Sequence, residues 1–180
     1  MLSILLKTAL AIDGMVEKLG KLAAWTVLFA ALISAGNALV RYGLDTSSNG
    51  WLEIQWYLFA GTVMLGAPVV LKLNEHVRVD ILYGKLKGQG PVYVDLIGLL
   101  LFLLPVMAIL TYLSWPLFYN MFVTGERSGN AGGLIRWPVG FLMPFGFGCM
   151  FVQGLSEVVK RLAHLQGLYT MDTHYEKPVQ

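Results

Sequence analysis

Four long apolar segments dominate the pattern of hydrophobic and polar positions along the chain. They lie near residues 22–44, 51–72, 92–115 and 137–159. Each is long enough to cross the hydrocarbon core of a bilayer, which takes about 20 helical residues. The third apolar stretch continues to residue 123, and we expect it to bend at Pro105 and Pro116. The pattern predicts an all-α integral membrane protein with four transmembrane helices.

The first 21 residues carry a different pattern. Apolar side chains recur there at intervals of three and four residues, which is the spacing of one helical stripe. The stripe consists of Leu2, Leu5, Ala9, Ile12, Val16 and Leu19. Because Asp13 and Glu17 are foreign to a cleaved signal peptide, we predict an amphipathic helix over residues 1–21, on the membrane surface or against a partner. Residues 1–166 then form one membrane domain, and 167–180 are predicted to be a polar, disordered tail.

The composition supports a location in the lipid bilayer. Of the 180 residues, 56% are hydrophobic and 13% are charged, and the mean hydropathy is +0.63. Soluble domains carry about 25% charged residues, so a soluble globular chain is excluded. The net charge of +2 comes with no clustered basic face, which excludes a nucleic-acid partner. The single cysteine, Cys149, excludes an intrachain disulfide.

Lys and Arg side chains are distributed unevenly between the two sides of the predicted bundle. Ten flank the termini and the 73–91 loop, whereas three flank the 45–50 turn and the 124–136 loop. Because cytoplasmic loops carry the excess of basic residues, both termini are predicted to be cytoplasmic.

Arg41 and Glu53 lie near the outer ends of the first two spans, with a short turn between them. We predict a structural ion pair between them, because a charge near the headgroups is inexpensive. The functional alternative makes Glu53 a proton or cation site. Asp95 and Glu157 lie near inner ends, and we interpret them as edge residues with lysines nearby.

No constellation of side chains points to catalysis or to a cofactor. His76, His164 and His174 lie outside the middle of the spans, so axial ligands for a haem are missing. No Ser–His–Asp grouping, activated cysteine or facing carboxylate pair is found, and we predict neither an enzyme nor a cofactor. His76 with Glu75 and Asp80 comes nearest to a metal site, but a solvated loop is the preferred interpretation.

The cytoplasmic loop between the second and third spans alternates polar and apolar side chains. Its polar motif consists of Glu75, His76, Arg78 and Asp80. A helical loop would pair Glu75 with Arg78 and His76 with Asp80, whereas the alternation also suits an extended segment. In either form we expect the loop to pack on its own bundle or on a partner subunit.

The outer loop, residues 124–137, is rich in glycine and matches no phosphate-binding pattern. We expect it to turn back over the membrane surface, with Arg136 and Trp137 at the headgroups and Pro138 opening the fourth span. Its candidate docking residues for a partner are Gly125, Glu126, Arg127, Ser128, Arg136 and Trp137.

Together these stretches resemble the small membrane subunit (DctQ-like) of tripartite ATP-independent periplasmic, or TRAP, transporters. The resemblance covers residues 20–165 and rests on "NALVRY", "WLEIQWY", "NEHVRVDIL" and "GERSGNAGGLIRWP", in that order. "EHVRVD" after the second of four spans is the most specific of these elements.

The resemblance implies a scaffold for a large multi-span membrane subunit, which carries the sodium and substrate sites. It also implies a soluble periplasmic binding protein that docks on the outer face. The implied activity is sodium-coupled import of an organic acid anion across the bacterial inner membrane. "SGNAGGLIRWP" resembles a branch associated with 2-oxo acids and related monocarboxylates. Two alternatives remain: an autonomous small multidrug-type exporter using Glu53, and a membrane anchor of a redox complex.

Overall fold

The computed structural model describes residues 2–46, 48–75, 86 and 88–171 of the chain. Its helices are α1 (Leu2–Leu44), α2 (Asn49–Leu73), α4 (Gly90–Gly98), the π-helical segment η1 (Leu99–Leu103), α5 (Leu104–Thr124) and α6 (Trp137–Leu165). α4, η1 and α5 follow one another without a break as a single span of 35 residues. Within the described residues, four helices are therefore long and apolar enough to cross a membrane, which confirms the predicted fold class.

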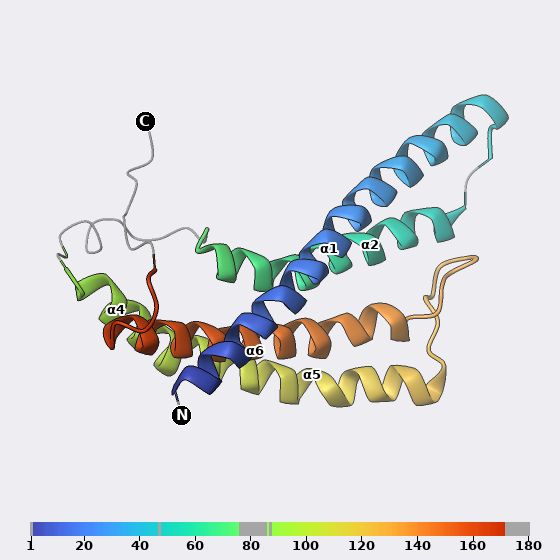
Figure 1. Ribbon diagram of the computed structural model, residues 1–180. Helices are drawn as coiled ribbons and strands as arrows, with labels where there is room; N and C mark the ends of the chain where they lie inside the picture. The colour runs from blue at the N-terminus through green and yellow to red at the C-terminus, as the bar shows by residue number, and fades with distance from the viewer. Residues whose placement is uncertain (1, 47, 76–85, 87, 172–180) are drawn as a thin grey trace.

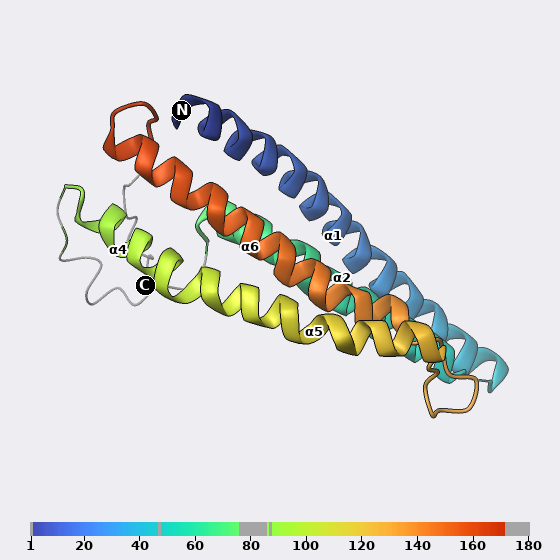
Figure 2. The same cartoon turned by 90° about the horizontal axis from the view of Figure 1, so that it is seen from below.

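The four spans form an elongated bundle in which α6 is central. α6 contacts α1, α2 and α5, and it carries the largest set of buried residues (Figure 1). Both views place the α1–α2 turn and the 125–136 loop at one end of the bundle (Figure 2). We call this end the hairpin end. The N-terminus and the start of α4 lie at the opposite end, which we call the terminal end.

Small residues let α6 approach its neighbours closely, as is usual where helices pack in membranes. A Cβ added at Gly146 would lie 2.7 Å from Met64 Cβ of α2. One added at Gly154 would lie 2.6 Å from Leu103 Cδ2 of η1. The side chains of α2 and of the third span thus fill the space that these two glycines leave.

Residues 2–21, for which a separate amphipathic helix was predicted, continue without a break into the first span and form the first half of α1. α1 runs for 43 residues, which is about 65 Å at 1.5 Å per residue. Ala9 and Val16 of the predicted stripe are 2% and 0% exposed. Ser156 Oγ of α6 donates to the Ala9 carbonyl oxygen at 3.1 Å. Ala9 and Val16 therefore pack inside the bundle of this chain, whereas Leu5 of the same stripe is 43% exposed.

Pro105, where a bend was predicted, lies just after the end of η1, in the first turn of α5. The Leu104 N–H donates to the Leu99 carbonyl five residues earlier, and Pro105 has no N–H to donate. Pro116 lies inside α5, which continues to Thr124. The fourth span is longer than predicted and ends at Leu165.

Candidate functional site

The predicted outer loop forms a short hairpin over residues 125–136. Arg127 and Ile135 form an antiparallel bridge, and the Ser128 N–H donates to the Leu134 carbonyl at 2.9 Å. The Gly133 N–H closes the turn onto the Asn130 carbonyl at 2.9 Å. The loop thus has a defined backbone geometry and folds back on itself.

Two glycines permit this geometry. Gly125 ends α5 in the left-handed region, at φ +60°, where its N–H donates to Met121 O. A Cβ added at Gly133 would lie 2.7 Å from Ser128 Cβ and 2.8 Å from Ser128 O. The two arms of the hairpin therefore approach too closely for any larger residue at position 133.

Glu53 of α2 holds the hairpin. Its Oε1 accepts from Ser128 Oγ and, at 2.7 Å, from Asn130 Nδ2. Its Oε2 accepts from the Leu134 N–H at 2.7 Å. Although it carries a charge, Glu53 is only 3% exposed. A buried carboxylate is stable when its oxygens receive hydrogen bonds, and here all three donors come from the hairpin.

The predicted ion pair between Arg41 and Glu53 is not formed. Arg41 is exposed on α1, and no ion pair between the two is present among the described residues. The side of α2 that carries Glu53 faces the hairpin, where three donors already occupy both carboxylate oxygens. Because the two spans are joined by a short turn, the sequence suggested a pairing that the helix faces do not permit.

Other predicted residues of this loop stabilise its ends. Arg136 Nη1 lies 2.6 Å from Glu126 Oε1, an ion pair across the base of the hairpin. Trp137 opens α6 and packs edge-on against Phe122 of α5, with ring centroids 5.6 Å apart. Pro138 lies in the first turn of α6, as predicted. Arg127 is exposed, and its side chain has no partner in the described part of the chain.

A second polar centre lies at the terminal end, between α1, α4 and α6. We call it the charge cluster, and it consists of Asp13, Asp95, Gln153, Ser156, Glu157, Lys160 and Arg161. Lys160 Nζ lies 2.8 Å from Asp13 Oδ2 and 2.5 Å from Glu157 Oε1. Lys160 is 4% exposed and Glu157 is 2% exposed, so this ion pair is buried.

The cluster continues from α6 to α4. Arg161 Nη1 lies 2.5 Å from Glu157 Oε2, while Arg161 Nη2 lies 2.9 Å from Asp95 Oδ2. Gln153 Nε2 donates to both Asp13 and Glu157, at 2.9 and 3.0 Å. The carboxylates are thus held by cations and amide donors, which is how buried charges are usually compensated.

A comparison of the sequence with protein families identifies the family of the chain. The family model described as tripartite ATP-independent periplasmic transporters, DctQ component, matches residues 30–164. The chain belongs to this family. No curated protein and no solved structure shows a significant match to it. The resemblance seen in the sequence is thereby confirmed: the DctQ family is a transporter component family that works with a large membrane subunit and a binding protein.

The charge cluster of this DctQ protein was not predicted. Asp95 and Glu157 were interpreted as edge residues near lysines, yet Glu157 is buried between Lys160 and Arg161. Spacings of three and four residues from Gln153 to Arg161 place polar groups on one face of α6, and this signal was available in the sequence. Asp13 lies outside the stretch that the family matches, and only the course of α1 places it here.

Most of the predicted cytoplasmic motif of the DctQ chain cannot be placed. Glu75 is exposed, and its N–H donates to the Val70 carbonyl at 3.1 Å after the end of α2. His76, Arg78 and Asp80 lie outside the described residues.

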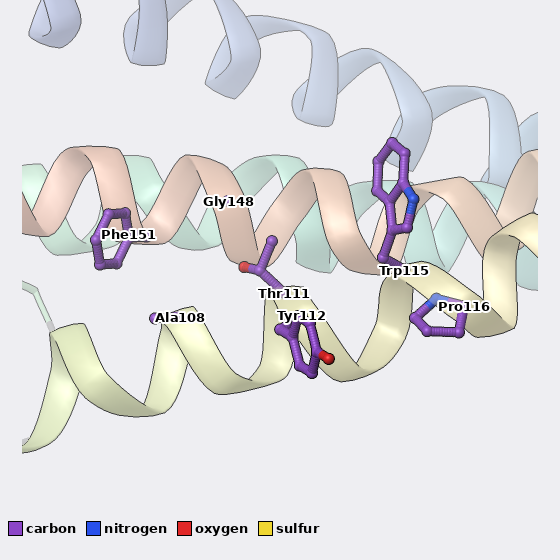
Figure 3. Close-up of a pocket in the computed structure, with 7 residues that line it drawn as sticks. All are labelled: Ala108, Thr111, Tyr112, Trp115, Pro116, Gly148 and Phe151. Carbon is purple, nitrogen blue, oxygen red and sulfur yellow. The ribbon is translucent and has the colours of Figure 1, made fainter.

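A cavity between α5 and α6 is almost wholly apolar. It measures about 460 Å³, and Figure 3 shows the seven residues that line it. The lining consists of Ala108, Thr111, Tyr112, Trp115, Pro116, Gly148 and Phe151. Thr111 Oγ1 already donates to the Met107 carbonyl at 2.7 Å. No charged side chain lines this cavity, so it offers no counter-ion for an organic anion.

Among the described residues, no group of three His, Cys, Asp or Glu side chains is arranged to hold a metal ion. His164 lies near the end of α6, where its Nδ1 is 3.1 Å from the Tyr169 carbonyl oxygen. Its ring is thus engaged by the segment that follows α6.

Proposed function

We propose that this chain is the scaffold subunit of a sodium-coupled, binding-protein-dependent TRAP importer of organic acid anions. The scaffold role is supported by one observation: the buried charged side chains of the chain bind other groups of the same chain. Glu53 is committed to the hairpin, and the buried acids and bases of the cluster are committed to one another. A transport site would need charged or polar groups that are free to bind substrate and ions near mid-depth.

The same observation weighs against an autonomous exporter. A proton-coupled carboxylate must gain and lose its proton during each cycle. Both oxygens of Glu53 accept hydrogen bonds from the hairpin, which stabilises the ionised form. Glu53 also lies in the second turn of α2, at the hairpin end of the bundle.

The partners follow from the family and from the exposed surface. The large membrane subunit would cover part of the apolar surface of α1 and α5, where Leu39 is 75% and Tyr112 is 77% exposed. The binding protein would dock at the hairpin end, which we take to face the periplasm, with both termini in the cytoplasm. The membrane would be the bacterial inner membrane. The carboxylate substrate, with 2-oxo acids and related monocarboxylates as the narrower candidates, would bind to the large subunit.

Reconstitution tests this proposal. The chain alone, the chain with its large subunit, and both with the binding protein are placed in liposomes. Uptake of a labelled 2-oxo monocarboxylate and of a labelled dicarboxylate is then followed with and without a sodium gradient. We expect uptake only in the three-component system and only with sodium. Sodium-driven uptake by the chain alone would refute the scaffold role.

A further inference from the structure

The tip of the hairpin, residues 129–132, is exposed and carries no bulky apolar side chain. Its residues are Gly129, Asn130, Ala131 and Gly132. Within the described part of the chain, the backbone N–H groups of Ala131 and Gly132 have no protein acceptor. Water or a polar protein surface can satisfy such groups, whereas lipid tails cannot. Arg127, also exposed, adds a positive charge beside the tip.

The position of the tip depends on α2. Ser128 precedes the tip, Asn130 lies within it and Leu134 follows it, and all three donate to Glu53. One carboxylate therefore joins both arms of the hairpin. Asn49 Nδ2 adds a 3.3 Å hydrogen bond to the Ala131 carbonyl, but this contact is exposed. The buried part of the attachment is Glu53.

α5 and α6 have contacts of their own that do not involve this attachment. Phe118 of α5 packs against Phe141 of α6 with ring centroids 5.2 Å apart. Phe122 and Trp137 continue this aromatic contact to the base of the hairpin. Glu53 therefore determines the position of the tip, while aromatic packing holds α5 and α6 together.

We propose that Glu53 is a positioning residue for docking: it presents the 129–132 tip to the soluble binding protein. The matching surface of that partner is rich in carbonyl and carboxylate acceptors, which suit the free N–H groups of the tip and the Arg127 guanidinium. A polar contact of this kind also suits a partner that must bind and leave during each transport cycle. The inference rests on the proposed function, since it takes the hairpin end to face the binding protein.

The test measures docking separately from assembly. The chain and its large subunit are purified together into lipid nanodiscs, and the fluorescently labelled binding protein of the same transport system is titrated onto them. Glu53→Ala should weaken docking by about tenfold and leave co-purification with the large subunit unchanged. Glu53→Gln should have a docking affinity between those of Glu53→Ala and the unaltered complex. Its amide oxygen still accepts from Ser128 and Asn130, but its NH₂ group opposes the Leu134 N–H.

Two further variants complete the design. Asp45→Asn is the matched control, because it removes one carboxylate from the same end, and asparagine tolerates the positive φ of 49° found there. It should dock normally. Ala131→Trp leaves the contacts of Glu53 intact but adds bulk to the exposed tip, and it should impair docking. In uptake assays, Glu53→Ala should raise the binding-protein concentration needed for half-maximal uptake and keep the saturating rate.

The outcomes separate the two ideas. Unchanged docking by either Glu53→Ala or Ala131→Trp overturns the inference, as does loss of the large subunit from Glu53→Ala. If the unaltered complex does not bind the binding protein at all, the proposed function fails and the inference fails with it.

Discussion

Lys160 and Asp13, 147 residues apart in the chain, meet inside the protein with Lys160 Nζ 2.8 Å from Asp13 Oδ2. This ion pair joins the first half of α1 to the last third of α6. Both residues are at least nine-tenths buried, at 4% and 7% exposure. The N-terminal half of α1 is therefore an integral part of the bundle.

Removing one partner of this pair should be costly. Lys160→Met leaves Asp13 and Glu157 without their shared cation, and breaking a buried pair costs about 3–5 kcal/mol. Asp13→Asn should cost less, because Lys160 keeps Glu157 as a partner. Thermal unfolding in detergent, monitored by circular dichroism, measures the loss of stability in both variants.

The double variant tests whether the two residues act together. Asp13→Asn combined with Lys160→Met should be more stable than the sum of the two single changes predicts, because each change removes the same contact. Lys7→Met, on an exposed position of the same helix, is the control and should have little effect. Additive effects of the two changes would show that the pair has no coupling energy.

The sequence predicted the fold more fully than it predicted the polar contacts. Span number and approximate bounds follow from apolar length, which one helix encodes by itself. The partner of a charged residue depends on which helix faces lie together, and this is a long-range property. Arg41 and Glu53 are close along the chain but point to different surroundings, whereas Asp13 and Lys160 are remote and pair.

The contacts of the hairpin were also beyond what the sequence could predict. A loop rich in glycine was predicted to turn back over the membrane, and the glycines do permit its turn. Its attachment to α2 depends on backbone N–H and carbonyl positions, such as the Leu134 N–H and the Ile135 carbonyl that Tyr57 Oη contacts at 3.2 Å. Residue types alone do not reveal such contacts. Glu53 was therefore predicted to pair with Arg41, whereas its partners lie in the hairpin.

Gly146 and Gly148 offer a matched pair for testing the packing of α6. A Cβ at Gly146 would lie 2.7 Å from Met64 Cβ and 2.9 Å from Met64 O, and the backbone oxygen cannot move aside cheaply. At Gly148 the nearest atom is Thr111 Cγ2, at 3.9 Å, an ordinary contact. Gly146→Ala should lower the free energy of unfolding by about 1–3 kcal/mol.

Gly148→Ala should be neutral or slightly stabilising, because alanine restricts the unfolded chain more than glycine does. The comparison uses the midpoint of thermal unfolding of both variants in the same detergent. Equal midpoints would mean that α2 and α6 are packed less closely than the structure indicates.

The orientation in the membrane can be tested with single cysteines in a Cys149→Ser background. Ala131 at the hairpin tip and Gln89 before α4 are both exposed, and they lie at opposite ends of the bundle. The excess of basic residues at the terminal end predicts that this end is cytoplasmic. Ala131→Cys in intact cells should react with a membrane-impermeant thiol reagent, and Gln89→Cys should react only after the cells are opened. Labelling of Gln89→Cys in intact cells would reverse the assignment.

Ala9 and Ala11 distinguish a packed N-terminal helix from one that lies on the membrane surface. Ala9 is 2% exposed against α6, and its carbonyl accepts from Ser156 Oγ, whereas Ala11 is exposed. A leucine at position 9 has no room and should lower the free energy of unfolding by about 1–3 kcal/mol. Ala11→Leu adds the same atoms toward the surroundings and should leave stability within about 0.5 kcal/mol. A helix that lay on the bilayer surface would tolerate both changes alike, because neither residue would meet α6. Thermal unfolding of the two variants in one detergent therefore decides between the two arrangements, and equal stability would contradict the packing of α1 on α6.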